Sequence, residues 1–272
     1  MVATAPRKSP ASGGRGAAPV LAAGTLLAGR YRLERVLARG GMGEVVAARH
    51  EQLGHRVAIK LLLPGVLDET ATRRVLREGR ALASLASAHV TRILDVGELD
   101  SGAPFIVMEL LEGEDLARVL ARDGKLPLET AASYLVQAAD AISEAHARGI
   151  VHRDLKPSNL FLTRARDGAP FIKLLDFGIS RPLGADADDS LTTTHATLGT
   201  PEFMSPEQYT GSRDIDPRAD VWSLGVVLFH LLTGRPILAR TVRLLSRSAS
   251  PGSRHRASAE STPRSPRPST RS

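Results

Sequence analysis

The sequence contains no cysteine among its 272 residues, which excludes both a disulfide framework and a cysteine-based metal site. It also lacks any run of 18 or more consecutive apolar residues, so it predicts no membrane-spanning helix. The stretch 17–28 follows several basic residues and has the outline of a signal peptide, but it continues directly into the first expected strand. We therefore expect a cytoplasmic protein without a membrane span.

Acidic residues are scarce at both ends of the chain, and this scarcity accounts for the net charge of +7. Residues 239–272 carry eight Arg against one Glu, and residues 1–30 carry four basic residues and no acidic one, which leaves about −4 for residues 31–238. The ends are also rich in small and polar residues, so we predict a flexible leader over 1–30 and a disordered Arg/Ser/Pro-rich tail over 239–272. Because this tail has no interleaved aromatic residues, nucleic-acid binding is only a third alternative and we expect no specific nucleic-acid partner.

Between these ends the hydrophobic pattern changes from strand-like to helix-like along the chain. In the first half, alternating or clustered apolar residues predict one helix at 69–86 and strands at 31–37, 44–49, 55–63, 93–99 and 105–111. In the second half, the pattern predicts helices around 131–145 and 219–233, with short strands near 159–162 and 171–175. A mainly β half followed by a mainly α half predicts a two-lobed α+β fold, with a small N-lobe over about 31–111 and a helical C-lobe over about 112–238.

Two motifs in the first half are ambiguous when taken alone. Gly40-Gly41-Met42-Gly43 lies between two expected strands, where glycines let a backbone approach phosphate oxygens closely, but a plain hairpin turn explains them as well. Lys60 follows the apolar run 57–59, and a lysine at the end of a strand is usually a solvated surface residue. Neither motif identifies a function by itself.

The second half contains a more specific run, Val151-His152-Arg153-Asp154-Leu155-Lys156-Pro157-Ser158-Asn159. Asp154 can orient a hydroxyl group and accept its proton, Lys156 can neutralise the charge of a moving phosphoryl group, and Asn159 can ligate Mg²⁺. Seventeen residues after Asn159 comes Asp176-Phe177-Gly178, whose carboxylate suits a hard cation such as Mg²⁺. Together these residues indicate phosphoryl transfer from a nucleotide.

With these motifs, residues 31–238 resemble the protein kinase family, and most of all the bacterial serine/threonine kinases of eukaryotic type. The resemblance implies ATP and Mg²⁺ as cofactors, Asp154 and Lys156 as catalytic residues, and Asn159 and Asp176 as metal ligands. It further implies that Lys60 holds the α- and β-phosphates and pairs with Glu78. The remaining nucleotide-binding residues that it implies are Gly40, Gly41, Gly43, Val45, Ala58 and the hinge residues Met108, Glu109 and Leu111.

The same resemblance implies a protein substrate with serine or threonine acceptors, since Lys156 and Thr200 match that class. Arg153 precedes the catalytic Asp154, and such arginines generally pair with a phosphorylated activation loop. We expect autophosphorylation in this loop; the alternative is a loop that is merely solvated. Asp220 matches the residue that anchors the catalytic-loop backbone, although a helix cap explains it as well. The candidate loop residues are Thr192, Thr193, Thr194, Thr197 and Thr200.

Two features depart from the family pattern. Ala38 stands where the first loop glycine is usual, and an added methyl group there stiffens the loop or crowds the phosphates. After residue 238 the tail replaces the further helices that usually complete the C-lobe, so we expect an incomplete, truncated catalytic domain with Glu207 buried and lacking its usual arginine partner. The alternative function is therefore an inactive truncated kinase-like chain with a binding or scaffolding role. Oligomeric state is not predicted by this sequence.

Overall fold

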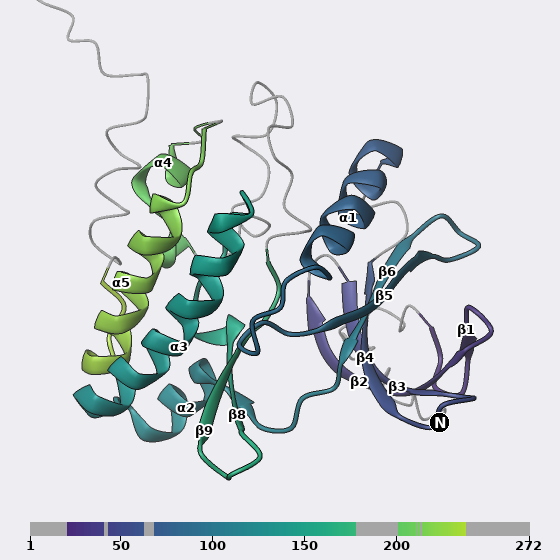
Figure 1. Ribbon diagram of the computed structural model, residues 1–272, viewed down its shortest axis with the longest axis horizontal. Coiled ribbons are helices and arrows are strands. Elements are labelled where there is room, and N and C mark those ends of the chain that lie inside the picture. The colour runs from purple at the N-terminus through teal and green to yellow at the C-terminus, as the bar shows by residue number, and fades with distance from the viewer. Residues whose placement is uncertain are drawn as a thin grey trace, which may run out of the picture.

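The computed structural model describes residues 21–40, 43–62, 68–177, 201–210, 212 and 214–237. These residues form two lobes, a small one built on a β-sheet and a large one built mainly of helices (Figure 1). The predicted two-lobed α+β fold is confirmed. The first 20 residues of the expected leader and the expected tail lie outside the described residues.

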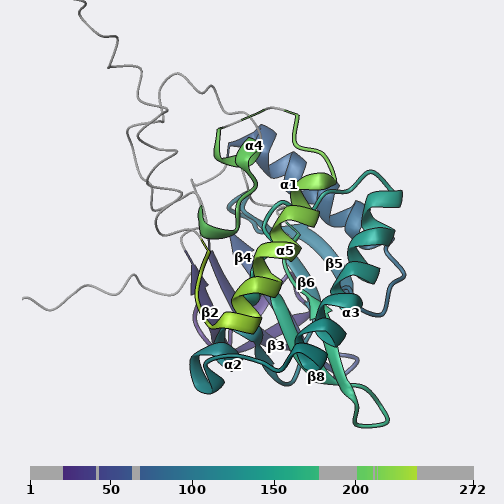
Figure 2. The same ribbon diagram turned by 90° about the vertical axis from the view of Figure 1, so that its left-hand side faces the viewer.

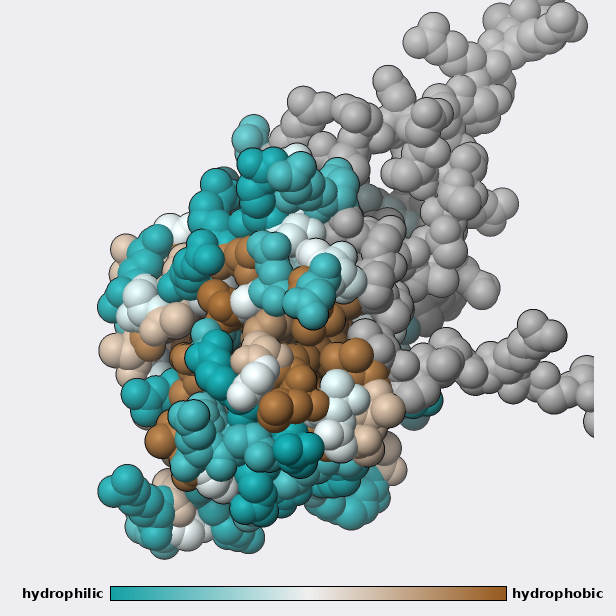
Figure 3. Space-filling model, turned by 90° about the vertical axis from the view of Figure 1, so that its right-hand side faces the viewer, coloured by the Kyte–Doolittle hydropathy of each residue, from teal (hydrophilic) through white to brown (hydrophobic). Residues whose placement is uncertain are grey.

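The small lobe is organised around an antiparallel sheet with the strand order β1-β2-β3-β4-β6-β5. Residues on β4 alternate between its two faces, as strand geometry requires. Val57, Ile59 and Leu61 belong to an apolar cluster confined to this lobe, whereas Leu62 belongs to the larger core shared with the other lobe. The strands are β1 (Leu26–Leu27), β2 (Tyr31–Gly40), β3 (Gly43–His50), β4 (Arg56–Leu62), β5 (Ile93–Glu98) and β6 (Pro104–Glu109). Viewed from the small-lobe side, apolar residues gather at the centre of the face among polar ones (Figure 3).

The expected leader is too long at its C-terminal end. Residues 26 and 27 form strand β1, which pairs with β2 in the register Leu27↔Tyr31. Leu27 is 2% exposed, because it packs into the apolar cluster of the small lobe. A two-residue strand is too short to produce a periodic pattern, so in the sequence its apolar residues do not stand out from the low-complexity segment before them.

Helix α1 (Glu69–Leu82) of the small lobe lies against β5 and β6 (Figure 1). The side chain of Asp68 caps its N-terminus by accepting a hydrogen bond from the Ala71 amide at 2.6 Å. Its buried residues follow helical spacing, and Gly79 allows close packing because a Cβ there would stand 3.0 Å from the Val96 side chain. The helix ends four residues before the predicted end at 86.

The large lobe consists of helices α2 (Leu116–Asp123), α3 (Leu128–Ala147), α4 (Pro206–Tyr209) and α5 (Arg218–Thr233), together with a three-stranded sheet. Helix α3 packs against α5 and against β9, and Figure 2 shows α3 beside α5. The sheet has the order β7-β8-β9, with β7 (Glu114–Asp115), β8 (Leu160–Arg164) and β9 (Pro170–Leu174), and the 3₁₀ turns are η1 (Pro157–Asn159) and η2 (Pro201–Phe203). The short elements α2, α4 and β7 were not predicted.

Helix α5 is apolar around most of its circumference. Leu231 is fully buried, and Gly234 ends the helix in the left-handed conformation at φ 69°. On its other side, Val221 is 63% exposed and Trp222 is 44% exposed. Helix α5 therefore leaves large apolar side chains exposed on that side. In the part of the chain that the structure describes, no helix combines the length and the apolar character needed to cross a bilayer.

Candidate active site

Two of the predicted site residues come from different lobes and meet between them. Lys60 lies on β4 and Asp176 follows β9, yet the Lys60 Nζ is 2.9 Å from the Asp176 Oδ1. The Lys60 side chain is only 15% exposed, so it is not the solvated surface lysine that its position in the sequence alone suggests. This ion pair therefore marks a cleft between the lobes.

The ionisation of Asp176 depends on that pair. Burial, the largest single effect, raises the pKa of this carboxyl group, but the charge and hydrogen bond of Lys60 and the smaller effects of neighbouring charges together hold the pKa below its usual value. The positive charges of His152, when protonated, and Lys156 act in the same direction. Asp176 is therefore an anion at neutral pH, as a ligand for a hard cation must be.

The run 151–159, called the catalytic loop from here on, brings Asp154, Lys156 and Asn159 together around the Asp154 carboxylate. Lys156 Nζ donates to the Asp154 Oδ2 at 2.9 Å, and the Asn159 Nδ2 lies 3.2 Å from the same oxygen. The Asn159 Nδ2 also donates to the backbone oxygen of Asp154 at 2.8 Å, and this orientation turns the Asn159 Oδ1 away from the carboxylate. The Asn159 side-chain oxygen and the Asp176 carboxylate fit a Mg²⁺ ion that takes its other ligands from phosphates and water. No cluster of three or more His, Cys, Asp or Glu suited to a metal occurs among the described residues.

Asp220 at the start of α5 anchors the backbone of this loop. Its carboxylate is fully buried and accepts hydrogen bonds from the backbone amides of His152 and Arg153, each at 2.8 Å. His146 Nε2 lies 2.7 Å from the same carboxylate, an interaction that the sequence did not reveal. The predicted anchoring role of Asp220 is confirmed. These bonds help to hold Arg153 at φ 64°, a conformation that residues other than glycine rarely adopt.

His152 is a structural link that sequence reasoning missed. The Asp154 amide donates to its Nδ1 at 3.2 Å, so the proton is on Nε2, which donates to the Leu175 carbonyl at 2.9 Å. Burial lowers the pKa of the imidazole, in keeping with this neutral form. Its ring also packs on Phe177, with centroids 4.7 Å apart. His152 thereby connects the catalytic loop to the segment that carries Asp176.

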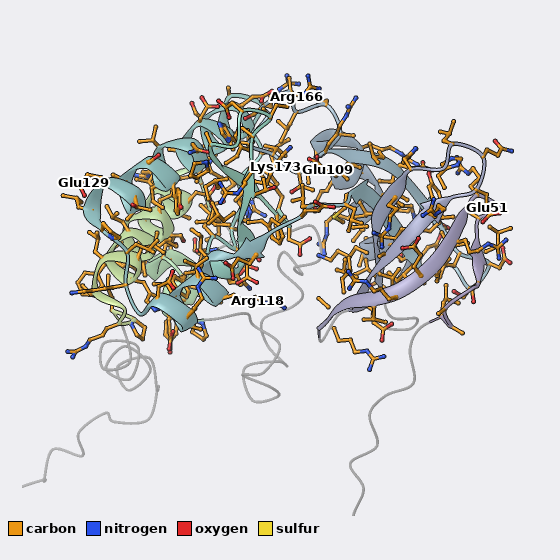
Figure 4. All side chains as sticks on the ribbon, turned by 90° about the horizontal axis from the view of Figure 1, so that it is seen from below. Glu51, Glu109, Arg118, Glu129, Arg166 and Lys173 are labelled. Atoms are coloured by element: carbon orange, nitrogen blue, oxygen red, sulfur yellow. The ribbon has the colours of Figure 1, made fainter. Side chains whose placement is uncertain are left out.

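The predicted hinge lies where β6 leaves the small lobe, with Met108 paired to Ala58 of β4. The Glu109 carboxylate accepts from Lys173 Nζ at 2.6 Å and from the Arg92 amide at 2.8 Å. Figure 4 shows Glu109 and Lys173 beside each other where the two lobes meet. Lys173 was not predicted, because a lone lysine on a short strand has no distinguishing pattern.

The hinge also leaves backbone groups accessible to a ligand. Within the described part of the chain, neither backbone group of Leu111 makes a hydrogen bond. Behind Met108 lies a small cavity of about 30 Å³, whose lining includes Lys60, Asp176 and Phe177. A wider hollow of about 680 Å³ lies elsewhere on the large lobe, between residues such as Glu112 and Tyr134, and none of the predicted site residues line it.

The glycine-rich turn joins β2 to β3. A Cβ at Gly43 would stand 2.0 Å from the Leu61 backbone oxygen, so this position requires glycine for close approach of the strands. Gly40 ends β2 and pairs with Gly43, whereas Gly41 lies outside the described residues. Val45 pairs with Lys60 in the next strand, so the expected nucleotide-binding residues of this lobe share one sheet.

Glu78 does not form the expected ion pair with Lys60. Lys60 bonds to Asp176 instead, and no Lys60–Glu78 pair occurs among the described residues. Burial raises the pKa of Glu78, and the opposing charges that act on it are those of Arg74, Arg153 and Arg77. The Glu78 carboxylate on helix α1 therefore interacts with arginines rather than with Lys60. The role of Glu78 in the reaction stays a prediction.

Glu207, which follows the predicted activation loop, differs from expectation in how deeply it is buried. Glu207 is half-buried rather than buried, and its charge contributes, after that of Asp216, to raising the pKa of Arg218. The expected cost of a buried carboxylate without a partner therefore does not apply here. The candidate phosphorylation sites Thr192, Thr193, Thr194 and Thr197 lie outside the described residues, as does Thr200, which was expected to match the substrate class.

Comparison with known proteins agrees with this geometry. The family model for the protein kinase domain matches residues 31–268. Pkn3 and Pkn1, both serine/threonine-protein kinases of Myxococcus xanthus, are 39% and 43% identical to the chain, covering 78% and 76% of it. The chain spans only 39% and 29% of the length of these two relatives. The crystal structure of the Mycobacterium tuberculosis PknI kinase domain matches with a TM-score of 0.64 at 32% identity, over 79% of each chain.

Proposed function

Since the chain belongs to the protein kinase family, we propose that it transfers the γ-phosphoryl group of ATP to serine or threonine hydroxyl groups of a protein substrate. One observation carries the proposal: a lysine of the small lobe and a carboxylate of the large lobe meet at 2.9 Å, beside a loop that holds a second carboxylate. In phosphoryl transfer most of the catalysis comes from positioning and charge stabilisation, which is what such an arrangement supplies.

In this mechanism Asp154 orients the acceptor hydroxyl group and takes its proton as the bond between this oxygen and the γ-phosphorus forms, while the bond from the γ-phosphorus to the β-phosphate oxygen breaks and ADP leaves. Lys156, 2.9 Å from that carboxylate, then lies close enough to balance negative charge on the transferred phosphoryl group. The two hydrogen bonds from the Asn159 side chain fix the position of Asp154. The reaction thus uses the loop as a preorganised unit.

In this mechanism Lys60 binds the nucleotide phosphates. Its ammonium group faces the anionic Asp176 carboxylate. Asn159 and Asp176 would hold Mg²⁺, which when bound neutralises charge on the β- and γ-phosphates. The hinge backbone beyond Met108, with the unbonded groups of Leu111, suits the adenine ring. A cytoplasmic location stays a prediction from the sequence.

To test this function, the purified chain is incubated with Mg²⁺ and ATP labelled at the γ-phosphate. Incorporation of the label into the chain itself and into a general protein substrate is then measured. The variant Asp154→Asn should reduce incorporation roughly 10²-fold to 10⁴-fold, because it removes the proton acceptor. The matched control is Asp167→Asn in the β8–β9 turn, where the asparagine oxygen can still accept from the Ala169 amide. Equal incorporation by the Asp154 variant and the control would refute the proposed mechanism.

We further propose autophosphorylation in the loop that contains Thr192–Thr194 and Thr197. Support comes from Arg153, Arg74 and Arg77, whose positive charges all act on the Glu78 carboxyl group and lower its pKa against burial, so this side of the site is rich in positive charge. Guanidinium groups are the preferred partners of phosphate oxygens. Phosphopeptide mapping of protein incubated with ATP tests this idea, and active protein with every one of these threonines unmodified would contradict it.

A binding role without catalysis is the second candidate function. The observation in its favour is that Lys60 and Glu78 are not paired, although the family mechanism uses that pair. ATP binding measured by calorimetry, together with no phosphate transfer from folded protein, would favour this second candidate.

A further inference from the structure

The side chain of Gln208 joins the start of helix α4 to the catalytic loop. Ser205 is the N-cap of α4, and its backbone amide donates to the Gln208 Oε1 at 3.1 Å, which forms one half of a capping box. The other end of the same amide, Nε2, donates to the backbone oxygen of Arg153 at 2.7 Å. The orientation of this amide is determined by its partners, since a backbone N–H requires the oxygen and a carbonyl requires the nitrogen.

The hydrogen bond from Gln208 restrains the backbone of Arg153, which has an unusual conformation. It is held at φ 64°, and a conformation of this kind persists only when the surroundings over-determine it. Asp220 binds its amide N–H at 2.8 Å, and Gln208 binds its carbonyl oxygen at 2.7 Å. Both backbone groups of the residue immediately before Asp154 are therefore held by side chains from other elements.

The segment that contains Gln208 is itself well anchored. Ser205 is fully buried, and the Ser223 hydroxyl of α5 donates to the Phe203 carbonyl at 2.8 Å. Gln208 thus connects an ordered segment, 201–210, to the loop that carries the proton acceptor. Helix α5 contributes to both ends of this connection, through Ser223 and Asp220.

We propose that Gln208 is a positioning residue for the phosphoryl transfer proposed above, on which this inference rests. Its donor group fixes the Arg153 peptide and thereby the direction in which the Asp154 carboxylate points. Its acceptor group caps α4 and is a separate, structural contribution. The two groups can be separated by substitution.

The variant Gln208→Glu keeps an oxygen for the Ser205 amide but places a second oxygen against the Arg153 carbonyl, where it repels. A glutamate at this helix position also suits the capping box and the helix dipole, so the stability of α4 is retained. The variant Gln208→Met has similar length and makes neither hydrogen bond. If Gln208 acts only as a cap, the glutamate variant behaves as wild type and the methionine variant is impaired.

If Gln208 positions the loop, kcat should fall more in the glutamate variant than in the methionine variant. We expect kcat of the glutamate variant to fall roughly fivefold to hundredfold, because the Arg153 carbonyl loses its donor and also faces a repelling oxygen. The KM for ATP should stay within about twofold, because Gln208 does not contact the nucleotide side of the cleft. The methionine variant should fall less, since it lacks the repulsion.

Gln137 supplies a matched control within the same lobe. Its side chain accepts from the Ile172 amide at 2.8 Å and donates towards the Pro170 carbonyl at 3.4 Å, the same pattern on α3 and β9, away from the catalytic loop. The variants Gln137→Glu and Gln137→Met therefore carry the same chemical changes without touching Arg153. They should keep the wild-type kcat.

Hydrogen–deuterium exchange of residues 150–156 gives a readout independent of activity. The amides of His152 and Arg153 are bonded to Asp220, and we expect their exchange to be about fivefold faster or more in both Gln208 variants and unchanged in both Gln137 variants. Wild-type exchange and kcat in the glutamate variant would overturn the inference. If the wild-type chain transfers no phosphate, the proposed function fails, and the exchange rates still decide whether Gln208 holds the loop.

Discussion

Replacing Asp220 by asparagine tests whether the catalytic loop depends on one buried carboxylate. The side chain keeps its size but loses its charge and one of its two acceptor oxygens. Three donors currently point at it: the His152 and Arg153 amides at 2.8 Å and His146 Nε2 at 2.7 Å. In the variant, the new amide N–H groups face at least one of these donors.

The magnitude follows from the hydrogen bonds that the substitution breaks or weakens. A buried backbone N–H without an acceptor costs about 1–3 kcal/mol, and hydrogen bonds to a charged group are worth more than neutral ones. We therefore expect Asp220→Asn to lower the free energy of unfolding by about 3 kcal/mol. For a domain of this size that corresponds to a Tm lower by roughly 6–12 °C.

The assay combines thermal unfolding with hydrogen exchange of the His152 and Arg153 amides and with phosphate transfer. The control is Asp216→Asn, an exposed partner of Arg218 whose loss should change Tm little. A Tm difference of about 2 °C corresponds to about 0.5–1 kcal/mol of unfolding free energy. If the Asp220 variant melts within that range of wild type and both loop amides stay protected, other interactions hold the loop. The anchoring argument would then be refuted.

Three further predictions concern other parts of the molecule. Gly43→Ala puts a Cβ 2.0 Å from a backbone oxygen of the next strand, whereas a Cβ at Gly225 on α5 would have no atom within 4 Å. We expect the first variant to lose roughly tenfold in ATP affinity by calorimetric titration, and Gly225→Ala to bind as wild type; equal losses would contradict this. Lys173→Met removes the ammonium group 2.6 Å from Glu109, so ATP affinity should fall about threefold to tenfold through a looser hinge, and an unchanged Kd would count against this role. The pKa of Glu144 is lowered, chiefly by a hydrogen bond from a backbone amide after α1, which outweighs the opposing effect of burial. Its stabilising contribution is therefore present above the unfolded pKa of about 4.3 and is lost as pH falls through the lower folded value, so Glu144→Gln should lower Tm at about pH 7 but not near about pH 3.

Long elements with a clear hydrophobic period were predictable from the sequence. Helix α5 was predicted at 219–233 and extends over Arg218–Thr233, because its apolar residues and the terminal glycine act locally. Short elements were missed for the opposite reason. Helix α4 has four residues and β7 has two, and elements of this size form because neighbouring parts of the fold position them.

The sequence by itself determined the family resemblance, because the order and spacing of Asp154, Lys156, Asn159 and Asp176 predict phosphoryl transfer whatever the surrounding fold; the roles of these residues stay predictions. It also determined the two-lobed class, because the hydrophobic period is a local property. Only the tertiary structure decided which charges meet. Lys60 pairs with Asp176 across 116 residues and not with Glu78, because ion pairs depend on distances between elements that no local pattern encodes. The same holds for His146 of α3 and Gln208 of α4, whose hydrogen bonds to Asp220 and to the Arg153 backbone oxygen join residues far apart in the sequence.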